Sequence, residues 1–256
     1  MKKHNGYVID RGLSPIDGNP YVVIVTVKCT NRKTGNMAQV WILRDDINPV
    51  EAMQTGKDAT ICGNCPHRRK QVWDAKRKRF KWVRSCYVNV GQAPNSIWKA
   101  YKRGVYKELS YVGMKELPSN GSFYSDVESI VQGRRIRWGA YGDPSVINPQ
   151  VVNLFNSYAE GHTGYTHQWR EEFASPFKGV FQASCDGFSD YLEATAHGWK
   201  TFSVVHKDAN IVYAKQCPAT VENSQAQCIT CKLCDGAKSD IFVHAHGSGS
   251  KHVTVA

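Results

Sequence analysis

Four cysteines in the last quarter of the chain carry the clearest chemical signal in the sequence. Cys217, Cys228, Cys231 and Cys234 lie within 18 positions with the spacing C-x10-C-x2-C-x2-C. A two-residue gap lets neighbouring thiolates turn onto one ion or cluster without backbone strain, and both structural zinc sites and iron–sulfur clusters use it. The segment therefore predicts a metal-binding loop that holds either an iron–sulfur cluster, of the 4Fe–4S type, or zinc.

A second cysteine group lies in the first half of the chain. Cys62 and Cys65 form another C-x2-C pair, and Cys86 follows 21 positions later. Three thiolates are one ligand short of a closed site, and the fourth ligand is His67, Cys185 or a group from outside the protein. A closed set of four ligands is usually structural, whereas an open position is where metal chemistry takes place.

Short strand-like runs in the second half of the chain each end in an ionisable or ligand-type side chain. These residues are Asp143, His167, Cys185 with Asp186, His206, and His244 with His246. Because parallel strands place their carboxyl ends at one edge of a sheet, we expect a common pocket there. If the protein is an enzyme, Asp143, His167, Asp186 and His206 would contact the substrate, with the histidines as proton-transfer groups.

The alternation of strand-like and helix-like runs predicts an α/β fold with parallel strands. With Cys62 at the end of a further run, about six strands can be counted, which indicates a partial parallel β/α barrel. Residues 1–57 are expected to be an N-terminal β-rich hairpin region, built from the runs 21–29 and 37–43. Residues 58–246 would be the barrel-like domain with its C-terminal cysteine-rich metal-binding loop, and residues 247–256 a flexible tail.

The chain carries a net charge of +11, which favours an anionic partner. Much of the excess lies between residues 67 and 84, interleaved with Trp73, Phe80 and Trp82. Basic side chains with aromatic rings between them are typical of proteins that hold single-stranded DNA or RNA. An acidic host protein is the alternative partner. The candidate nucleic-acid contacts are Arg68, Arg69, Lys70, Arg77, Lys78, Arg79 and Lys81.

The cellular setting follows from what the sequence lacks. Apolar runs are too short to span a bilayer, and the first residues have no apolar region of a signal peptide, so we expect a cytoplasmic protein without a membrane partner. Nine cysteines in such a chain indicate metal or redox chemistry rather than disulfides, because the cytosol keeps thiols reduced.

Several motifs together resemble a group of uncharacterised, cysteine-rich proteins encoded by bacteriophages. They are the Cys65-Pro66 and Cys86-Tyr87 steps, GAYGDP at 139–144, TGYTHQW at 163–169, SCD at 184–186 and the terminal cysteine motif with the histidine-bearing run after it. Those phage proteins are distantly similar to radical S-adenosylmethionine enzymes. The resemblance covers residues 62–246 and implies a partial β/α barrel and an iron–sulfur cluster with one open iron site.

One motif of that enzyme group is absent. Its C-x3-C-x2-C loop has no counterpart here, so S-adenosylmethionine binding does not carry over. Two hypotheses follow. In the first, a phage-encoded iron–sulfur protein acts in the host cytoplasm with a basic surface toward nucleic acid, as a non-enzyme or as a radical-type enzyme. In that hypothesis Cys62, Cys65 and Cys86, with Cys185, hold a second cluster. In the second, zinc stabilises a non-enzymatic protein that binds nucleic acid or an acidic host protein.

Overall fold

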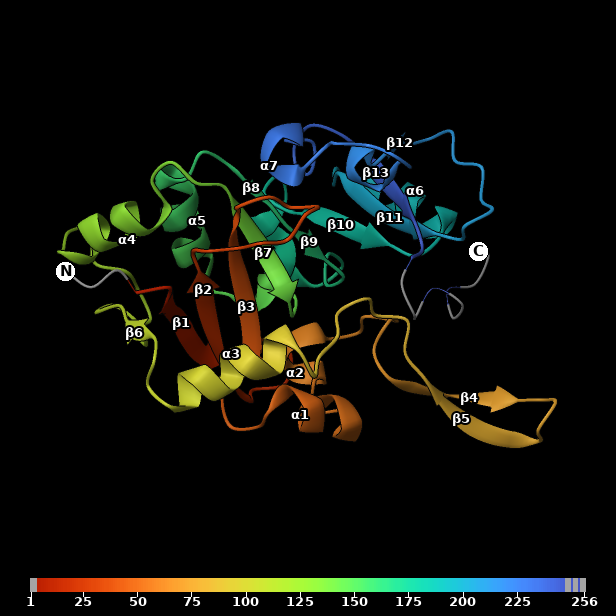
Figure 1. The fold of residues 1–256 in the computed structure, drawn as a ribbon, viewed down its shortest axis with the longest axis horizontal. Helices are drawn as coiled ribbons and strands as arrows, with labels where there is room; N and C mark the ends of the chain where they lie inside the picture. Colours follow the sequence, from red (N-terminus) through yellow and green to blue (C-terminus); the bar gives the residue numbers. More distant parts are fainter. Residues whose placement is uncertain (1–3, 247–249, 251–252, 254–256) are drawn as a thin grey trace.

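Three β-sheets organise the chain, and two of them follow one another along the polypeptide (Figure 1). The computed structural model describes residues 4–246, 250 and 253. The predicted tail, 247–256, lies outside the described residues apart from positions 250 and 253. The α/β class predicted from the alternating runs is confirmed.

The first sheet has the strand order β6-β1-β2-β3-β7-β8. Its strands are β1 (Gly6–Leu13), β2 (Pro20–Thr26), β3 (Ala38–Arg44), β6 (Lys107–Glu108), β7 (Ile136–Tyr141) and β8 (His162–Thr163). The strands β1, β2 and β3 are antiparallel, so the predicted N-terminal hairpin is present as β2–β3. The strand β7 pairs in parallel with β3, which joins residues of the 1–57 region to the 58–246 region in one sheet.

The second sheet is entirely parallel, with the order β12-β13-β11-β10-β9. Its strands are β9 (Tyr165–Thr166), β10 (Gln182–Cys185), β11 (Thr201–Val205), β12 (Lys215–Gln216) and β13 (Ile241–His244). Their carboxyl ends therefore lie along one edge. This edge is the one that the polar strand ends were expected to share.

The barrel prediction differs from the structure. Among the described residues the strands divide between separate sheets, and none of the sheets closes. The chain leaves the first sheet after β8 and enters the second at β9, with Gly164 between them. A side chain at Gly164 would lie 2.3 Å from the Phe181 ring, so the close approach needs glycine. Cys62 ends a short helix, α2 (Ala59–Cys62), and not a strand.

Helices cover the sheets and connect their strands (Figure 1). They are α1 (Pro49–Thr55), α3 (Ala93–Lys102), α4 (Phe123–Val131), α5 (Pro149–Tyr158), α6 (Phe188–Ala196) and α7 (Cys228–Cys231), with the 3-10 turns η1 (Pro144–Val146), η2 (Glu172–Phe177) and η3 (Pro218–Thr220). The described part contains no helix of the length and apolarity that crossing a membrane requires.

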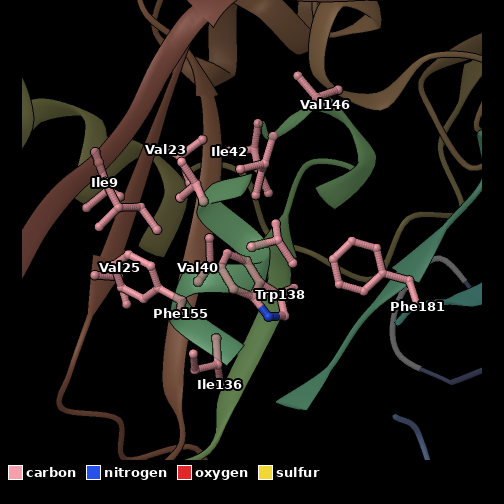
Figure 2. Close-up of a cluster of buried hydrophobic side chains, with 14 of the residues drawn as sticks. Ile9, Val23, Val25, Val40, Ile42, Ile136, Trp138, Val146, Phe155 and Phe181 are labelled. Carbon is pink, nitrogen blue, oxygen red and sulfur yellow. The ribbon is translucent and has the colours of Figure 1, made fainter. Parts of the chain in front are cut away.

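Aromatic packing joins the two large sheets (Figure 2). Trp138 of β7 is fully buried, with its ring centroid 6.2 Å from that of Phe155 on α5 and 6.4 Å from that of Phe181 before β10. Its indole Nε1 donates a hydrogen bond to Asn156 Oδ1 at 2.9 Å, so no polar group of the ring is left unsatisfied. The core thus fixes β7 against β10, whose carboxyl ends lead into the candidate site.

Candidate metal centres

The predicted cysteine loop forms backbone hydrogen bonds with a turn of the first sheet. We call Cys217, Cys228, Cys231 and Cys234 the cysteine quartet. The backbone N–H of Cys228 donates to the carbonyl of Lys33 at 2.9 Å, and that of Ile229 donates to Thr34 at 3.2 Å. Both acceptors lie in the turn between β2 and β3. The loop that follows β12 therefore bridges the second sheet to a turn of the first.

All four sulfur-bearing side chains of the quartet line one pocket, which Tyr165 of β9 also lines. Cys228 and Cys231 are one helical turn apart on α7, so their side chains lie on the same face. The Tyr165 hydroxyl hydrogen-bonds to Cys234. Burial raises the pKa of the Cys234 thiol to about 12, and the neighbouring cysteines add to the rise while Tyr165 opposes it. A bound cation would remove this penalty on the thiolates.

The spacing of the quartet is wider than a single preformed zinc ion requires. Four sulfur atoms around one zinc lie about 3.8 Å apart, because tetrahedral Zn–S bonds are about 2.3 Å long. The whole quartet lies in the described part of the chain, and no three of its sulfur atoms are all within 4.8 Å of one another. The four cysteines therefore line one pocket without forming a ready-made site for a single ion.

A second centre combines residues that the sequence did not group. His67, His167 and Asp186, which we call the mixed centre, each offer a ligand atom within 4.8 Å of the others. The distance from His67 Nε2 to Asp186 Oδ1 is 2.7 Å, and from His167 Nε2 to Asp186 Oδ2 it is 3.4 Å. Two atoms bound at about 2.1 Å to one cation lie about 3.0–3.4 Å apart, so the His167–Asp186 separation suits a shared ion, while His67 and Asp186 lie at the distance of a direct ion pair.

His67 Nε2 and Asp186 Oδ1 are both buried, and they pair with each other at 2.7 Å. The other ring nitrogen, His67 Nδ1, hydrogen-bonds to Ser85 Oγ at 2.8 Å. When Nδ1 carries the proton, Nε2 presents its lone pair toward Asp186, as in many metal-bound histidines.

One thiol of the first cysteine group, Cys65, contacts the mixed centre. Cys65 Sγ lies 3.9 Å from His167 Nε2, close to the separation of two ligands on one zinc ion. Burial raises the pKa of Cys62 well above its usual value, and the charges of Cys65 and Cys86 raise it further. Cys62, Cys65 and Cys86 therefore lie near one another, with Cys65 beside His167.

Charge in the mixed centre is strongly coupled. Burial disfavours a charged His167, but Cys65 and Asp186 beside it outweigh burial and raise its pKa well above the usual value. For Asp186 burial acts to raise the pKa, yet hydrogen bonds and charge from His167 and His67 hold it below its usual range. The carboxylate is thus kept ionised, which is the form that binds a cation.

The fold explains why these residues meet. The strands β9 and β10 are parallel neighbours, so His167 after β9 lies beside Asp186 after β10. The prediction that strand ends converge is therefore confirmed for this pair. Gly63, with φ +50, lets Gln168 pack against the backbone, where its side-chain amide donates to the Cys62 carbonyl at 3.2 Å. This contact holds the C-x2-C turn against the strand end.

Other predicted site residues lie elsewhere or serve another role. Asp143 Oδ2 accepts a hydrogen bond from the His167 backbone at 2.8 Å and Oδ1 accepts two from Ser145, so Asp143 positions His167. Cys185 is 1% exposed within the hydrophobic core, and its thiol donates to the Ala183 carbonyl at 3.6 Å. Burial there raises the Cys185 pKa, which disfavours the thiolate.

His206 lies further along the same edge. It follows β11, the neighbour of β10, and its carbonyl accepts a hydrogen bond from the His244 ring at 3.0 Å. His246 in turn lies 3.2 Å from Lys33 Nζ. These histidines are paired with one another and with the β2–β3 turn, apart from the mixed centre.

Two residues that position the ligand-type side chains could not be recognised from the sequence. Ser85 orients the His67 ring and Gln168 braces Cys62, and both types are common in loops. Their only indication was position, since Ser85 precedes Cys86 and Gln168 follows His167. His67 was one of the alternatives for a fourth ligand, but its pairing with Asp186 depends on contacts 119 positions apart in the chain.

The basic segment forms an antiparallel hairpin, β4 (Lys70–Asp74) and β5 (Arg79–Val83), which extends away from the two large sheets (Figure 1). We call it the arm. Arg68 turns inward to an ion pair with Asp58 at 2.7 Å, and Lys81 pairs with Asp74 at 3.1 Å. The exposed basic residues of the predicted set are Lys70, Arg77, Lys78, Arg79 and Lys81, and Arg69 stacks on Trp82.

Two histidines and a carboxylate are a donor set for Zn²⁺ or Fe²⁺. Such a set leaves coordination positions for water or a substrate, and a cation held there would act as a Lewis acid. The side chains of His67, His167 and Asp186 are 15%, 21% and 26% exposed, so solvent reaches the centre.

Comparison of the chain with protein-family models, with curated proteins and with solved structures gives no match. The resemblance to cysteine-rich phage proteins stays a prediction based on its motifs.

Proposed function

We propose that the protein binds metal at two centres of different kinds, an iron–sulfur cluster at the cysteine quartet and a single divalent cation at the mixed centre. The observation that carries the proposal is the convergence of His67, His167 and Asp186, whose ligand atoms all lie within 4.8 Å of one another. Two imidazoles and a carboxylate brought together in this way, and only partly open to solvent, are a donor set for a divalent cation.

Iron–sulfur rather than zinc at the quartet is supported by its spacing, because the evenly stepped C-x2-C-x2-C pattern is typical of ferredoxin-type sites. The mixed centre takes the place of the second cluster expected from Cys62, Cys65, Cys86 and Cys185. Its nitrogen and oxygen donors favour a single ion.

We further propose that the basic arm faces nucleic acid in the cytoplasm of the host cell. The supporting observation is the exposure of its cationic side chains on a projecting hairpin, where phosphate groups can reach them.

Anaerobic purification followed by visible spectroscopy and elemental analysis tests the metal proposal. We expect broad absorption from a brown iron–sulfur chromophore, plus one equivalent of a second divalent metal. The variant C231S should lose the chromophore and keep the second metal. The variant D186N should do the reverse. Cys29→Ser is the matched control, because Cys29 belongs to neither centre, and should keep both.

A colourless protein with stoichiometric zinc at the quartet would overturn the iron–sulfur part and favour the zinc hypothesis. Equal metal content in the wild type and D186N would overturn the mixed centre.

A further inference from the structure

One face of the arm presents three large aromatic side chains to solvent. Trp73 pairs with Phe80 and Gln71 pairs with Trp82 across the hairpin, so these residues lie on the same face. Trp73, Phe80 and Trp82 are 56%, 63% and 53% exposed. Single exposed aromatic residues are ordinary, but three on one face of a projecting hairpin form a surface with a chemical preference.

The side chains around this face favour a polyanion with flat apolar groups. Residues 67–84 contain nine Lys and Arg residues and one Asp. The Arg69 guanidinium lies 3.8 Å from the Trp82 ring centroid, and the Trp73 and Phe80 rings meet edge to face at 5.2 Å. Phe80 and Trp82 lie two positions apart on β5, where the backbone rises by about 6.6 Å, so their rings offer successive stacking platforms. Bases of an unpaired strand stack on such rings while its phosphates meet the cations.

The arm needs external support to hold this face in place. Of the strand residues in β4 and β5, Val83 is the one that is buried, and an isolated two-stranded hairpin is marginally stable in water. Support comes at its base. The Cys86 N–H donates to the His67 carbonyl at 3.0 Å, and the His67 ring bonds to Ser85 at 2.8 Å. Both ends of the arm therefore meet at a residue of the mixed centre.

We propose that this aromatic face binds single-stranded nucleic acid, with bases stacked on Trp73, Phe80 and Trp82, and that a cation in the mixed centre strengthens the binding by fixing the base of the arm. The second part rests on the proposed metal function. The first part stands without it, because it depends on the exposed rings and the charge around them.

Fluorescence anisotropy with labelled oligothymidylate and oligouridylate over a range of salt concentrations tests the first part. Trp73→Ala and Trp82→Ala should each weaken binding by about 10-fold, with an unchanged salt slope. The control Val72→Ala changes the opposite face of the same hairpin and should bind as the wild type does. Arg77→Gln and Lys78→Gln should instead lower the salt slope by about one each. If both Trp variants bind as tightly as Val72→Ala, stacking is excluded.

The choice of partner has its own test. Competition with duplex DNA and with a polyglutamate peptide should displace the labelled strand poorly. Equally tight binding of the peptide, with the same dependence on Trp73 and Trp82, would identify an acidic protein as the partner and overturn the proposal.

The role of the cation is tested with metal-loaded protein, chelated protein and Asp186→Asn, each analysed for metal. Chelation and Asp186→Asn should weaken oligonucleotide binding and speed tryptic cleavage within residues 69–84. Unchanged binding and cleavage after the metal has left would overturn the coupling. If the wild type never takes up a second metal, the proposed function fails there, while the aromatic-face result is unaffected.

Discussion

The cysteine quartet and the mixed centre differ in where their residues come from. The four cysteines of the quartet come from one segment, 217–234, and one helical turn presents two of them. The mixed centre combines His67 before the arm, His167 after β9 and Asp186 after β10. A local motif can be recognised from spacing, whereas a centre assembled from distant segments exists only once the sheet has formed.

The two centres therefore have different relations to stability. Metal binding at the quartet would hold a loop with little apolar packing against the β2–β3 turn, so its energy is largely folding energy. At the mixed centre the fold already places the ligands, through Trp138 in the core and the parallel pairing of β9 with β10. A cation at the mixed centre would bind to side chains that the fold has already brought together, so little of its binding energy would be spent on folding.

The largest effect is expected for Cys231→Ser. Because structural metal sites contribute several kcal/mol or more to folding, we expect stability to fall by more than about 3 kcal/mol, which lowers the Tm by roughly 10 °C in a chain of this size. Thermal unfolding under anaerobic conditions measures it. The matched control is Cys29→Ser, and a Tm within the error of that control would show that the quartet is not structural.

Removal of the mixed-centre carboxylate should affect metal affinity strongly and stability only slightly. We expect Asp186→Ala to lower metal affinity by more than about 100-fold, because outer contacts of a ligand alone are worth 10–100-fold. Stability should fall by about 1 kcal/mol, since the ion pairs lost are partly exposed. Calorimetric metal titration and thermal unfolding together check both. A large fall in Tm without a loss of metal affinity would show that Asp186 stabilises the fold and does not bind metal.

The turn that carries the first cysteine pair provides a subtler test. A Cβ at Gly63 would lie 2.2 Å from Gln168 Oε1, so Gly63→Ala should push Gln168 off the Cys62 carbonyl. We expect about 1–3 kcal/mol of destabilisation from the positive φ, with weaker metal binding in addition. Gly56→Ala is the control, because Gly56 has φ +76 and nothing within 4 Å of an added Cβ. Equal metal affinity in the two variants would count against a bracing role for Gln168.

The smallest effect should come from Ser85→Ala. Loss of the hydrogen bond to His67 Nδ1 frees the ring to rotate, and we expect metal affinity at the mixed centre to fall by about 10-fold with the quartet unaffected. The control is Ser129→Ala on the exposed face of α4. Titration with the second metal distinguishes the two variants. Identical binding curves would show that Ser85 does not position His67 for metal binding.

Sequence patterns predicted the local features well. The β2–β3 hairpin follows from two β-branched runs around a turn, and the quartet follows from its spacing. The shared edge of His167 and Asp186 follows from polar residues at strand ends. The first two features depend on neighbours within a few positions, where propensity and periodicity act, and the third depends on the parallel pairing of β9 with β10.

Other features depend on contacts that no local pattern contains. The run before Cys62 has β-branched residues but forms α2, because Asp58 and Cys62 close a helical turn against the first sheet. The expected barrel does not form because β7 pairs with β3 of the N-terminal region. Cys185 differs from Asp186 because successive strand residues point to opposite faces, which sends the thiol into the core.

The two-residue strand β9 lies between the cysteine quartet and the mixed centre. Tyr165 in β9 bonds to Cys234, and His167, two positions later, belongs to the histidine–aspartate group. Residues so spaced on an extended chain are about 6.6 Å apart. If a cluster bound at the quartet and a cation at the mixed centre, an electron gained or lost by the cluster would shift the electric potential at the cation, so the cation's affinity would depend on the oxidation state of the cluster.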